Sequence, residues 1–249
     1  MDPPPSSLSY FTPEVAATLR DAVPLQAWRT ALLLIDVQRY NLHREGAVWA
    51  SRRRRARERN NEAEQAEEEA QFFAAVDACV PNWRLLLQAA RQSGAEPLFT
   101  VIQSLTRDGR DRGLDYKISG MHVAPGSDDA LVLESVGGGP LIAEKDELPV
   151  LAKSTSSPFA STPLEYLLKS LGRDQLVVCG ALTDQCVSST VREAADRGLR
   201  VALCSDACVG SSREAHVEAI RHVKGYARVL TSAEAAAELL GGSCSVEGG

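Results

Sequence analysis

Residues 175–187, QLVVCGALTDQCV, decide the fold of this chain. The first five form a short apolar run without the clean alternation of a half-exposed strand, which is typical of a strand buried on both faces. The polar residues after it predict a turn and then a helix that begins at Asp184. A buried strand leading directly into a helix is the repeating unit of parallel α/β sheets. We therefore interpret this stretch as one strand–helix unit of such a sheet.

The same alternation continues on both sides of that unit. Apolar runs predict further strands at 31–35, 97–102, 149–152, 200–204 and 227–230, and amphipathic runs predict helices at 63–93, 161–171, 184–197, 212–224 and 233–240. Gly94, Gly172 and Gly198 follow three of these helices, at the position where C-terminal caps belong. The pattern predicts one α/β domain, a Rossmann-like three-layer sandwich with a mostly parallel six-stranded sheet flanked by helices.

Length and composition limit the kind of protein. The 249 residues, with a net charge of −6, fit one domain at 10–240 between a disordered tail at 1–9 and a flexible tail at 241–249. The acidic balance argues against a nucleic-acid partner, and no run reaches the about 18 apolar residues of a membrane span. The N-terminus lacks the pattern of a secretory signal, so we expect a cytoplasmic protein with six free cysteines.

Residues 51–70 form a charged insertion in this pattern. Arg52–Arg55 are followed by acids that include Glu67–Glu69. One interpretation is a nucleic-acid or nuclear-import patch. The acids neutralise the arginines, which favours a solvated helical extension of the helix that ends near Ser93.

Residues 106–139 form a second, Gly- and Asp-rich segment that reads as a lid over the site. Arg107, Arg112 and Lys117 are cations there, with Tyr116 between them. They are candidates to bind a substrate carboxylate, and the alternative is that they are solvated loop charges.

Three residues with chemical potential follow predicted strands. Asp36, Lys153 and Cys186 come after the runs ALLLI, PVLA and QLVVC, and the carboxyl ends of parallel strands share one crevice. A cysteine in the first turn of a helix is favoured as thiolate, with an acid as its base and an ammonium to stabilise negative charge. The alternatives are a buried small cysteine, a capping aspartate and a solvated lysine.

The motifs LLLIDVQ (32–38), KSTSSPFAST (153–162), GALTDQCVSSTVREAADRGLRV (180–201) and SDAC (205–208) resemble those of the isochorismatase-like cysteine hydrolases. This superfamily contains nicotinamidases, N-carbamoylsarcosine amidase, ureidoacrylate amidohydrolases and biuret hydrolase. The resemblance implies Asp36 as base, Lys153 as its charged partner and Cys186 as nucleophile. It also implies a cis peptide between Ala181 and Leu182, which would turn the Leu182 N–H toward the Cys186 N–H to form an oxyanion hole.

The resemblance also implies surrounding roles and an assembly. It places Thr183 and Asp184 as supports of the site, and Ser157, Phe159 and Thr162 in a loop that shapes the pocket. Its N-carbamoyl-type members suggest that Gln38, Tyr40 and Asn41 line an amide pocket. We expect no cofactor and a homo-oligomer, either a dimer or a tetramer.

Departures from the family pattern narrow the function. The segment TVIQSLTRDGRD lacks the histidine of the nicotinamidase metal motif, so we predict no metal site and disfavour nicotinamide. Cys186 argues against the vinyl-ether hydrolysis of isochorismatases, which lack this nucleophile. The first hypothesis is a cysteine amidohydrolase that cleaves a C–N bond of a small linear amide or ureide. The alternatives are an isochorismatase-type hydrolase, a nicotinamidase and a catalytically silent interaction protein.

Overall fold

The computed structural model of the chain describes residues 23–133 and 147–241. The predicted tail at 1–9, residues 242–249 of the tail predicted at 241–249, and residues 134–139 of the predicted lid lie outside the described residues. Within the described ranges, none of the helices has the length and apolar character needed to cross a membrane.

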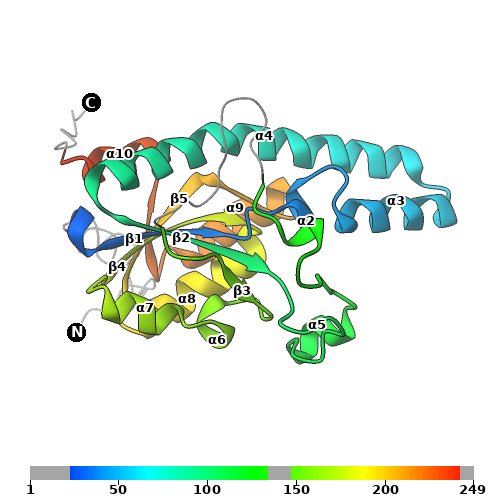
Figure 1. The fold of residues 1–249 in the computed structure, drawn as a ribbon. Helices are drawn as coiled ribbons and strands as arrows, with labels where there is room; N and C mark the ends of the chain where they lie inside the picture. Colours follow the sequence, from blue (N-terminus) through cyan, green and yellow to red (C-terminus); the bar gives the residue numbers. More distant parts are fainter. Residues whose placement is uncertain (1–22, 134–146, 242–249) are drawn as a thin grey trace, which may run out of the picture.

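Six parallel strands form the sheet, in the order β3-β2-β1-β4-β5-β6 (Figure 1). The strands are β1 (Thr30–Ile35), β2 (Glu96–Ile102), β3 (Leu151–Lys153), β4 (Gln175–Ala181), β5 (Arg200–Val209) and β6 (Ala227–Leu230). The order reverses direction between β1 and β4, so the carboxyl ends of these two strands form the crevice in which such folds place their ligands. The predicted fold class is therefore confirmed.

Helices cover the sheet on both faces. They are α2 (Arg39–Leu42), α3 (Ala47–Arg59), α4 (Glu62–Ser93), α5 (Leu114–Ile118), α6 (Pro158–Ser161), α7 (Leu164–Ser170), α8 (Ser188–Asp196), α9 (Arg213–Val223) and α10 (Ser232–Leu239), with short turns η1 (Ala27–Arg29), η2 (Asp128–Ala130) and η3 (Thr183–Val187). Figure 1 shows α4 and α10 along one face and α6, α7 and α8 along the other. This is the expected three-layer arrangement.

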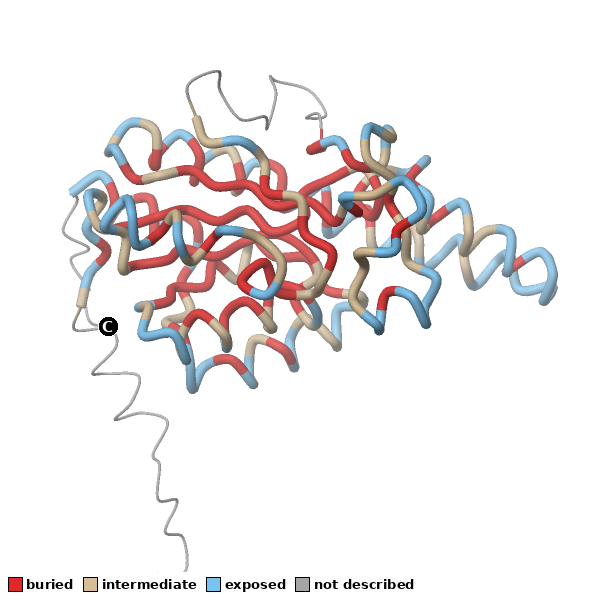
Figure 2. The backbone as a smooth tube through the Cα atoms, turned by 60° about the horizontal axis from the view of Figure 1, so that its bottom comes forward, coloured by how far each residue is buried: buried red, intermediate tan, exposed pale blue. Residues whose placement is uncertain are grey.

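The core lies between these layers. Every residue of β1 and of β4 is buried, and the strands form the continuous buried centre in Figure 2. Strands covered by helices on both faces need apolar side chains on both sides, which explains the absence of alternation in the sequence. Gly94, Gly172 and Gly198 have φ values of 81°, 65° and 82°, the left-handed conformation of helix C-terminal caps.

The charged insertion differs in part from its prediction. Residues 62–70 extend the helix that ends at Ser93, as predicted, because they form the start of α4. Residues 51–59 do not, since the chain reverses at Asn60, which has left-handed backbone angles, and α3 packs against the first half of α4. The arginines and glutamates pair across this helical hairpin, with Arg53 2.7 Å from Glu69 and Arg52 3.6 Å from Glu68. Figure 1 shows the hairpin extending beyond the edge of the sheet.

Two other boundaries also differ. The helix predicted at 161–171 is the shorter α7, which begins after Pro163 at its N-cap, and a separate short helix, α6, precedes it because Pro163 has no N–H to continue α6. The strand predicted at 200–204 continues to Val209 after an irregularity in its pairing with β4.

Candidate active site

The three polar residues predicted at strand ends meet at one point. Lys153, the last residue of β3, places its Nζ 2.8 Å from Asp36 Oδ2 and 3.3 Å from Cys186 Sγ. Its third contact is the main-chain oxygen of Thr155, at 3.0 Å. Asp36 and Lys153 are fully buried and Cys186 is 4% exposed. One ammonium group therefore connects a carboxylate and a thiol in a site shielded from solvent.

Backbone and side chains of β2 hold Asp36 in place. Its main-chain N–H donates to the Thr100 main-chain oxygen at 3.1 Å, and the Thr100 hydroxyl donates to Asp36 Oδ1 at 2.9 Å. Asp36 has a φ of 50°, a left-handed conformation that aspartate tolerates better than most residues. The sheet register explains the meeting, because Ile35 pairs with Gly180 on β4 and Ile102 of β2 pairs with Lys153.

The protonation states follow from burial and neighbouring charge. Burial raises the pKa of the Cys186 thiol to about 11, although Lys153 acts to lower it, and the Asp36 carboxylate also raises it. Burial acts to lower the pKa of Lys153, but its interactions with Asp36, Cys186 and Tyr116 together outweigh burial and hold the pKa above its usual value. The raised pKa of Cys186 contradicts the thiolate expected from the helix-start position in the ligand-free site, because desolvation outweighs the stabilisation of the thiolate by Lys153.

The other described cysteines, Cys79, Cys179, Cys204 and Cys208, are free, and burial raises the pKa of each. Among the five cysteines in the described part of the chain, Cys186 is the one with the Lys153 ammonium in contact with its sulfur. No group of three or more His, Cys, Asp or Glu side chains suited to a metal ion occurs among the described residues.

The loop that carries Cys186 is tied to the end of β5. The Ala181–Leu182 peptide bond is cis, as the family resemblance implies. Asp184 accepts hydrogen bonds from the Ser211 main-chain N–H at 2.8 Å and from its hydroxyl at 2.7 Å. Thr183 contacts His216 Nδ1 at 2.9 Å. Thr183 and Asp184 thus position the turn η3.

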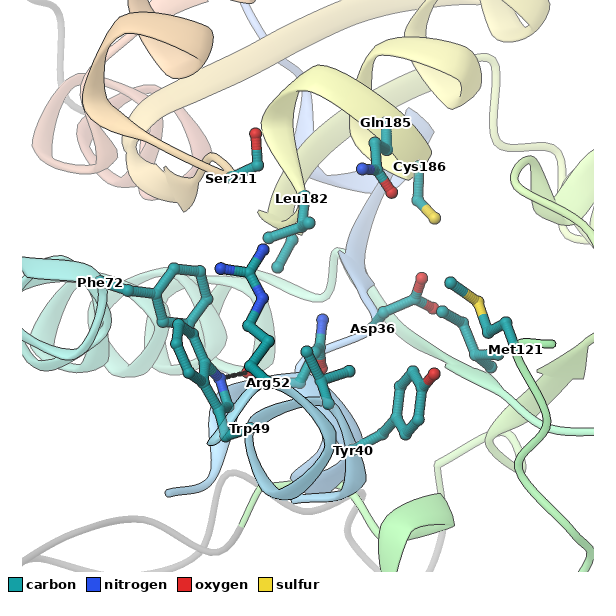
Figure 3. A pocket seen from close by; sticks show the side chains of 14 residues that line it. Asp36, Tyr40, Trp49, Arg52, Phe72, Met121, Leu182, Gln185, Cys186 and Ser211 are labelled. Atoms are coloured by element: carbon teal, nitrogen blue, oxygen red, sulfur yellow. Dashed lines mark hydrogen bonds between the residues drawn. The ribbon is translucent and has the colours of Figure 1, made fainter. Parts of the chain in front are cut away.

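An open pocket with a cavity volume of about 170 Å³ leads to Asp36 and Cys186 (Figure 3). Its walls come from α2, α3, α4, β2, β4, the turn η3 and loops that connect these and neighbouring elements. The lining residues are Asp36, Tyr40, Asn41, Val48, Trp49, Arg52, Phe72, Ile102, Met121, Ala181, Leu182, Gln185, Cys186 and Ser211. This surface combines apolar and aromatic side chains with few polar groups, as small-molecule sites do.

Three of the candidate substrate-binding residues lie at this site. Tyr40 and Asn41 line the pocket, and the buried Tyr116 hydroxyl is 3.8 Å from Cys186 Sγ. Burial raises the pKa of Tyr116, so it carries a proton at neutral pH.

Four other candidates lie elsewhere. Gln38 is fully buried, and its side chain bonds main-chain groups of Ile102 and Asp129, so it connects β2 to η2. Arg107 and Lys117 are exposed and do not line the described pocket. Phe159 is buried below the Arg197 guanidinium and outside the pocket lining. A single position in a motif cannot reveal which way a side chain points.

Sequence reasoning missed the contribution of the hairpin to the pocket. Val48, Trp49 and Arg52 lie on one face of α3, and Phe72 faces them from α4. The spacing of Trp49 and Arg52 could have indicated this contribution, because residues three apart on a helix lie on the same face and this helix follows Asp36 closely in the sequence. The glutamates that neutralise the arginines favoured the interpretation of a solvated helix, so no role in the pocket was predicted for Trp49 or Arg52.

Comparisons with known proteins agree with this geometry. The family model described as Isochorismatase domain matches residues 30–235. A probable inactive nicotinamidase from Arabidopsis thaliana is 29% identical over 203 residues, 80% of this chain and 90% of the relative. N-carbamoylsarcosine amidase from an Arthrobacter species is 30% identical over 129 residues, 50% of this chain and 47% of that relative. Three further curated relatives are matched over less than two thirds of their length.

The fold also has solved counterparts. The crystal structure of a cysteine hydrolase from Pseudomonas syringae pv. phaseolicola 1448A superposes with a TM-score of 0.69. The sequences are 22% identical, and the match covers 87% of this chain and 95% of that one. At this identity the similarity establishes the shared fold.

Proposed function

Because this chain belongs to the isochorismatase family of hydrolases, we propose that it is a cysteine-dependent amidohydrolase of small linear amides or ureides. In this proposal Cys186 is the nucleophile, Asp36 is the general base and then the general acid, and Lys153 is their electrostatic partner. The similarity to N-carbamoylsarcosine amidase supports a C–N bond as the one cleaved.

One observation carries the proposal, namely the Lys153 ammonium in contact with both Asp36 and Cys186. A purely structural ion pair would not need a thiol as a third member. The ammonium stabilises the thiolate in the course of the reaction, while the high pKa of Cys186 keeps the ligand-free thiol protonated. The proton therefore leaves the sulfur as the substrate binds, and a buried carboxylate is available to accept it.

The first half of the proposed reaction forms a thioester. Asp36 accepts the Cys186 proton while the sulfur attacks the carbonyl carbon. The main-chain N–H groups of Leu182 and Cys186 donate to the resulting oxyanion. The C–N bond then breaks, Asp36 gives its proton to the leaving nitrogen, and the acyl group stays on the sulfur.

The second half releases the acyl group. A water molecule gives a proton to Asp36 and attacks the thioester carbon, which forms a second oxyanion at the same two N–H groups. The C–S bond breaks, the carboxylic or carbamic acid leaves, and Asp36 returns the proton to the sulfur. Every proton taken up by Asp36 is given back within one turnover, so this route needs no further reactant.

The test is ammonia or amine release from a panel of linear ureides and primary amides. We expect Cys186→Ala to lower turnover at least a thousandfold while the circular dichroism spectrum stays unchanged. Cys79→Ala is the matched control, since it removes another buried thiol that lies outside the pocket lining.

Different outcomes separate the alternatives. Full activity of the Cys186→Ala variant would exclude the thioester route and would favour chemistry of the isochorismatase type. Inactivity of the wild type on the whole panel, without acylation of Cys186 by activated esters, would favour a catalytically silent relative. Acylation that depends on Asp36 would support the proposed roles even before the natural substrate is known.

A further inference from the structure

The α3–α4 hairpin places one cation in the pocket. Among the described residues that line it, Asp36 and Arg52 are the charged ones, and the charge of Asp36 is balanced by Lys153. Figure 3 shows the Arg52 side chain extending from α3 toward Leu182, across the pocket from Cys186. Arg52 is therefore the group on this surface that can attract an anion.

The position of Arg52 is set by aromatic packing. Its guanidinium carbon lies 5.0 Å from the centroid of the Trp49 ring, a cation–π arrangement. Trp49 is 2% exposed, donates its indole N–H to the main-chain oxygen of Asn41 at 3.0 Å, and packs on Phe72 with ring centroids 4.9 Å apart. A rigid aromatic support of this kind lowers the entropy cost of holding the guanidinium in one place.

The existing partner of Arg52 leaves the guanidinium available. Glu68 lies 3.6 Å away, and the two side chains are 40% and 55% exposed, so this is a weak surface pair. A guanidinium has five N–H donors in a planar fork that matches a carboxylate. A carboxylate inside the pocket can thus bind Arg52 without first breaking a strong bond.

A second polar group faces the same space. Asn41 is 8% exposed and lines the pocket, and its side-chain oxygen is buried without a hydrogen-bond partner in the described structure. A buried acceptor of this kind is stabilised by a ligand that supplies an N–H group. An amide or ureide supplies such a group next to the carbonyl that Cys186 would attack.

We propose that the hairpin selects substrates that carry a carboxylate on an apolar stem. Arg52 binds the carboxylate, the stem lies against Trp49 and Phe72, and Asn41 accepts a hydrogen bond from the substrate nitrogen. This substrate class rests on the proposed amidohydrolase function. In this proposal the charged insertion binds the substrate carboxylate, a role that the sequence had suggested for the lid cations Arg107, Arg112 and Lys117.

The experiment uses alkylation of Cys186, which needs no turnover. The reagents are N-iodoacetylglycine, N-iodoacetyl-β-alanine and N-iodoacetyl-γ-aminobutyrate, each compared with its primary amide, with glutathione as the reference thiol. For at least one pair we expect wild-type Cys186 to react about 10- to 100-fold faster with the acid than with the amide, after correction for the reference. We expect Arg52→Gln to remove this preference and Arg52→Lys to retain part of it.

Arg54→Gln is the matched control, because Arg54 is exposed on the same helix and is not among the residues that line the described pocket. It should leave the ratio of the two rates unchanged. Equal rates for every acid and its amide in the wild type, or a preference that persists in Arg52→Gln, would overturn the proposal. Failure of every reagent to reach Cys186 would overturn it too, since Arg52 and Cys186 would then not share an accessible pocket.

Turnover assays separate this proposal from the function on which it rests. If alkylation shows a preference for acids that depends on Arg52 but no amide is hydrolysed, the proposal that Arg52 binds an anion stands and the proposed amidohydrolase function is rejected. If ureides that carry a carboxylate and their neutral counterparts are hydrolysed equally well, the amidohydrolase function stands and the proposed role of Arg52 is rejected. If both proposals hold, Arg52→Gln should raise KM for carboxylated substrates at least tenfold, with kcat and the neutral substrates little affected.

Discussion

Replacing Lys153 by methionine tests the electrostatic centre of the site. The side chain is fully buried and has three contacts, with Asp36 Oδ2, the Thr155 main-chain oxygen and Cys186 Sγ. Methionine fills a similar volume but cannot neutralise Asp36, whose remaining side-chain donor is the Thr100 hydroxyl. The variant therefore keeps the packing and leaves a buried carboxylate without its counterion.

The expected loss is large for a single substitution. Removing one partner of a buried ion pair typically lowers the free energy of unfolding by about 3–5 kcal/mol. For a domain of this size each 1 kcal/mol corresponds to about 2–4 °C, so the melting temperature should fall by about 6–20 °C. Urea unfolding at pH 7, followed by tryptophan fluorescence, measures the free energy directly.

A double-mutant cycle decides whether charge is the cause. Asp36→Asn combined with Lys153→Met removes both charges, and the double variant should recover at least about 2 kcal/mol relative to Lys153→Met alone. Lys169→Met is the control, because its pair with Glu165 lies at the surface and should contribute at most about 1 kcal/mol. A Lys153→Met protein as stable as the wild type, or a double variant with no recovery, would refute the reasoning.

Three further predictions concern the same region. Alkylation of Cys186 by iodoacetamide in the ligand-free protein should rise with pH to a midpoint near 11, because the raised pKa keeps the thiol protonated below it; a midpoint near 9 would contradict this. Gly180→Ala should lower the free energy of unfolding, measured by urea titration, by about 3 kcal/mol or more, because a Cβ there would lie 2.1 Å from a main-chain oxygen of β1. Gly172→Ala is the control, since a Cβ there meets open space, and it should lower the free energy of unfolding by about 1 kcal/mol. Asp184→Ala should lower kcat at least tenfold with a smaller change in stability, because the turn η3 loses both bonds to Ser211; unchanged kinetics would argue against a positioning role.

Much of the fold could be predicted because it depends on local patterns. The apolar runs marked all six strands, and glycines marked three helix ends, since burial on both faces and left-handed caps each leave a sequence signal. The predicted helices were wrong where the same local sequence pattern is compatible with two structures. A charge-rich stretch is compatible with one long helix or with two antiparallel helices, and only the packing of α3 on α4 selects the second.

The candidate site shows the same division. Asp36, Lys153 and Cys186 could be singled out because each follows a buried strand, and parallel strands bring such positions to one edge. Thr100, which donates to Asp36, carried no such signal. The protonation state of Cys186 could not be predicted either, because it depends on desolvation by residues distant in sequence.

The sequence by itself determined a doubly wound parallel sheet and the three polar residues at its carboxyl edge, because strand burial and strand ends are local properties. The tertiary structure alone decided which side chains surround them. In the folded chain the Gln38 side chain bonds the main chain of β2 and of η2, Arg107 and Lys117 are exposed to solvent, and Arg52 lines the pocket. The physical reason is that side-chain direction and solvent exclusion depend on contacts between segments far apart in the chain.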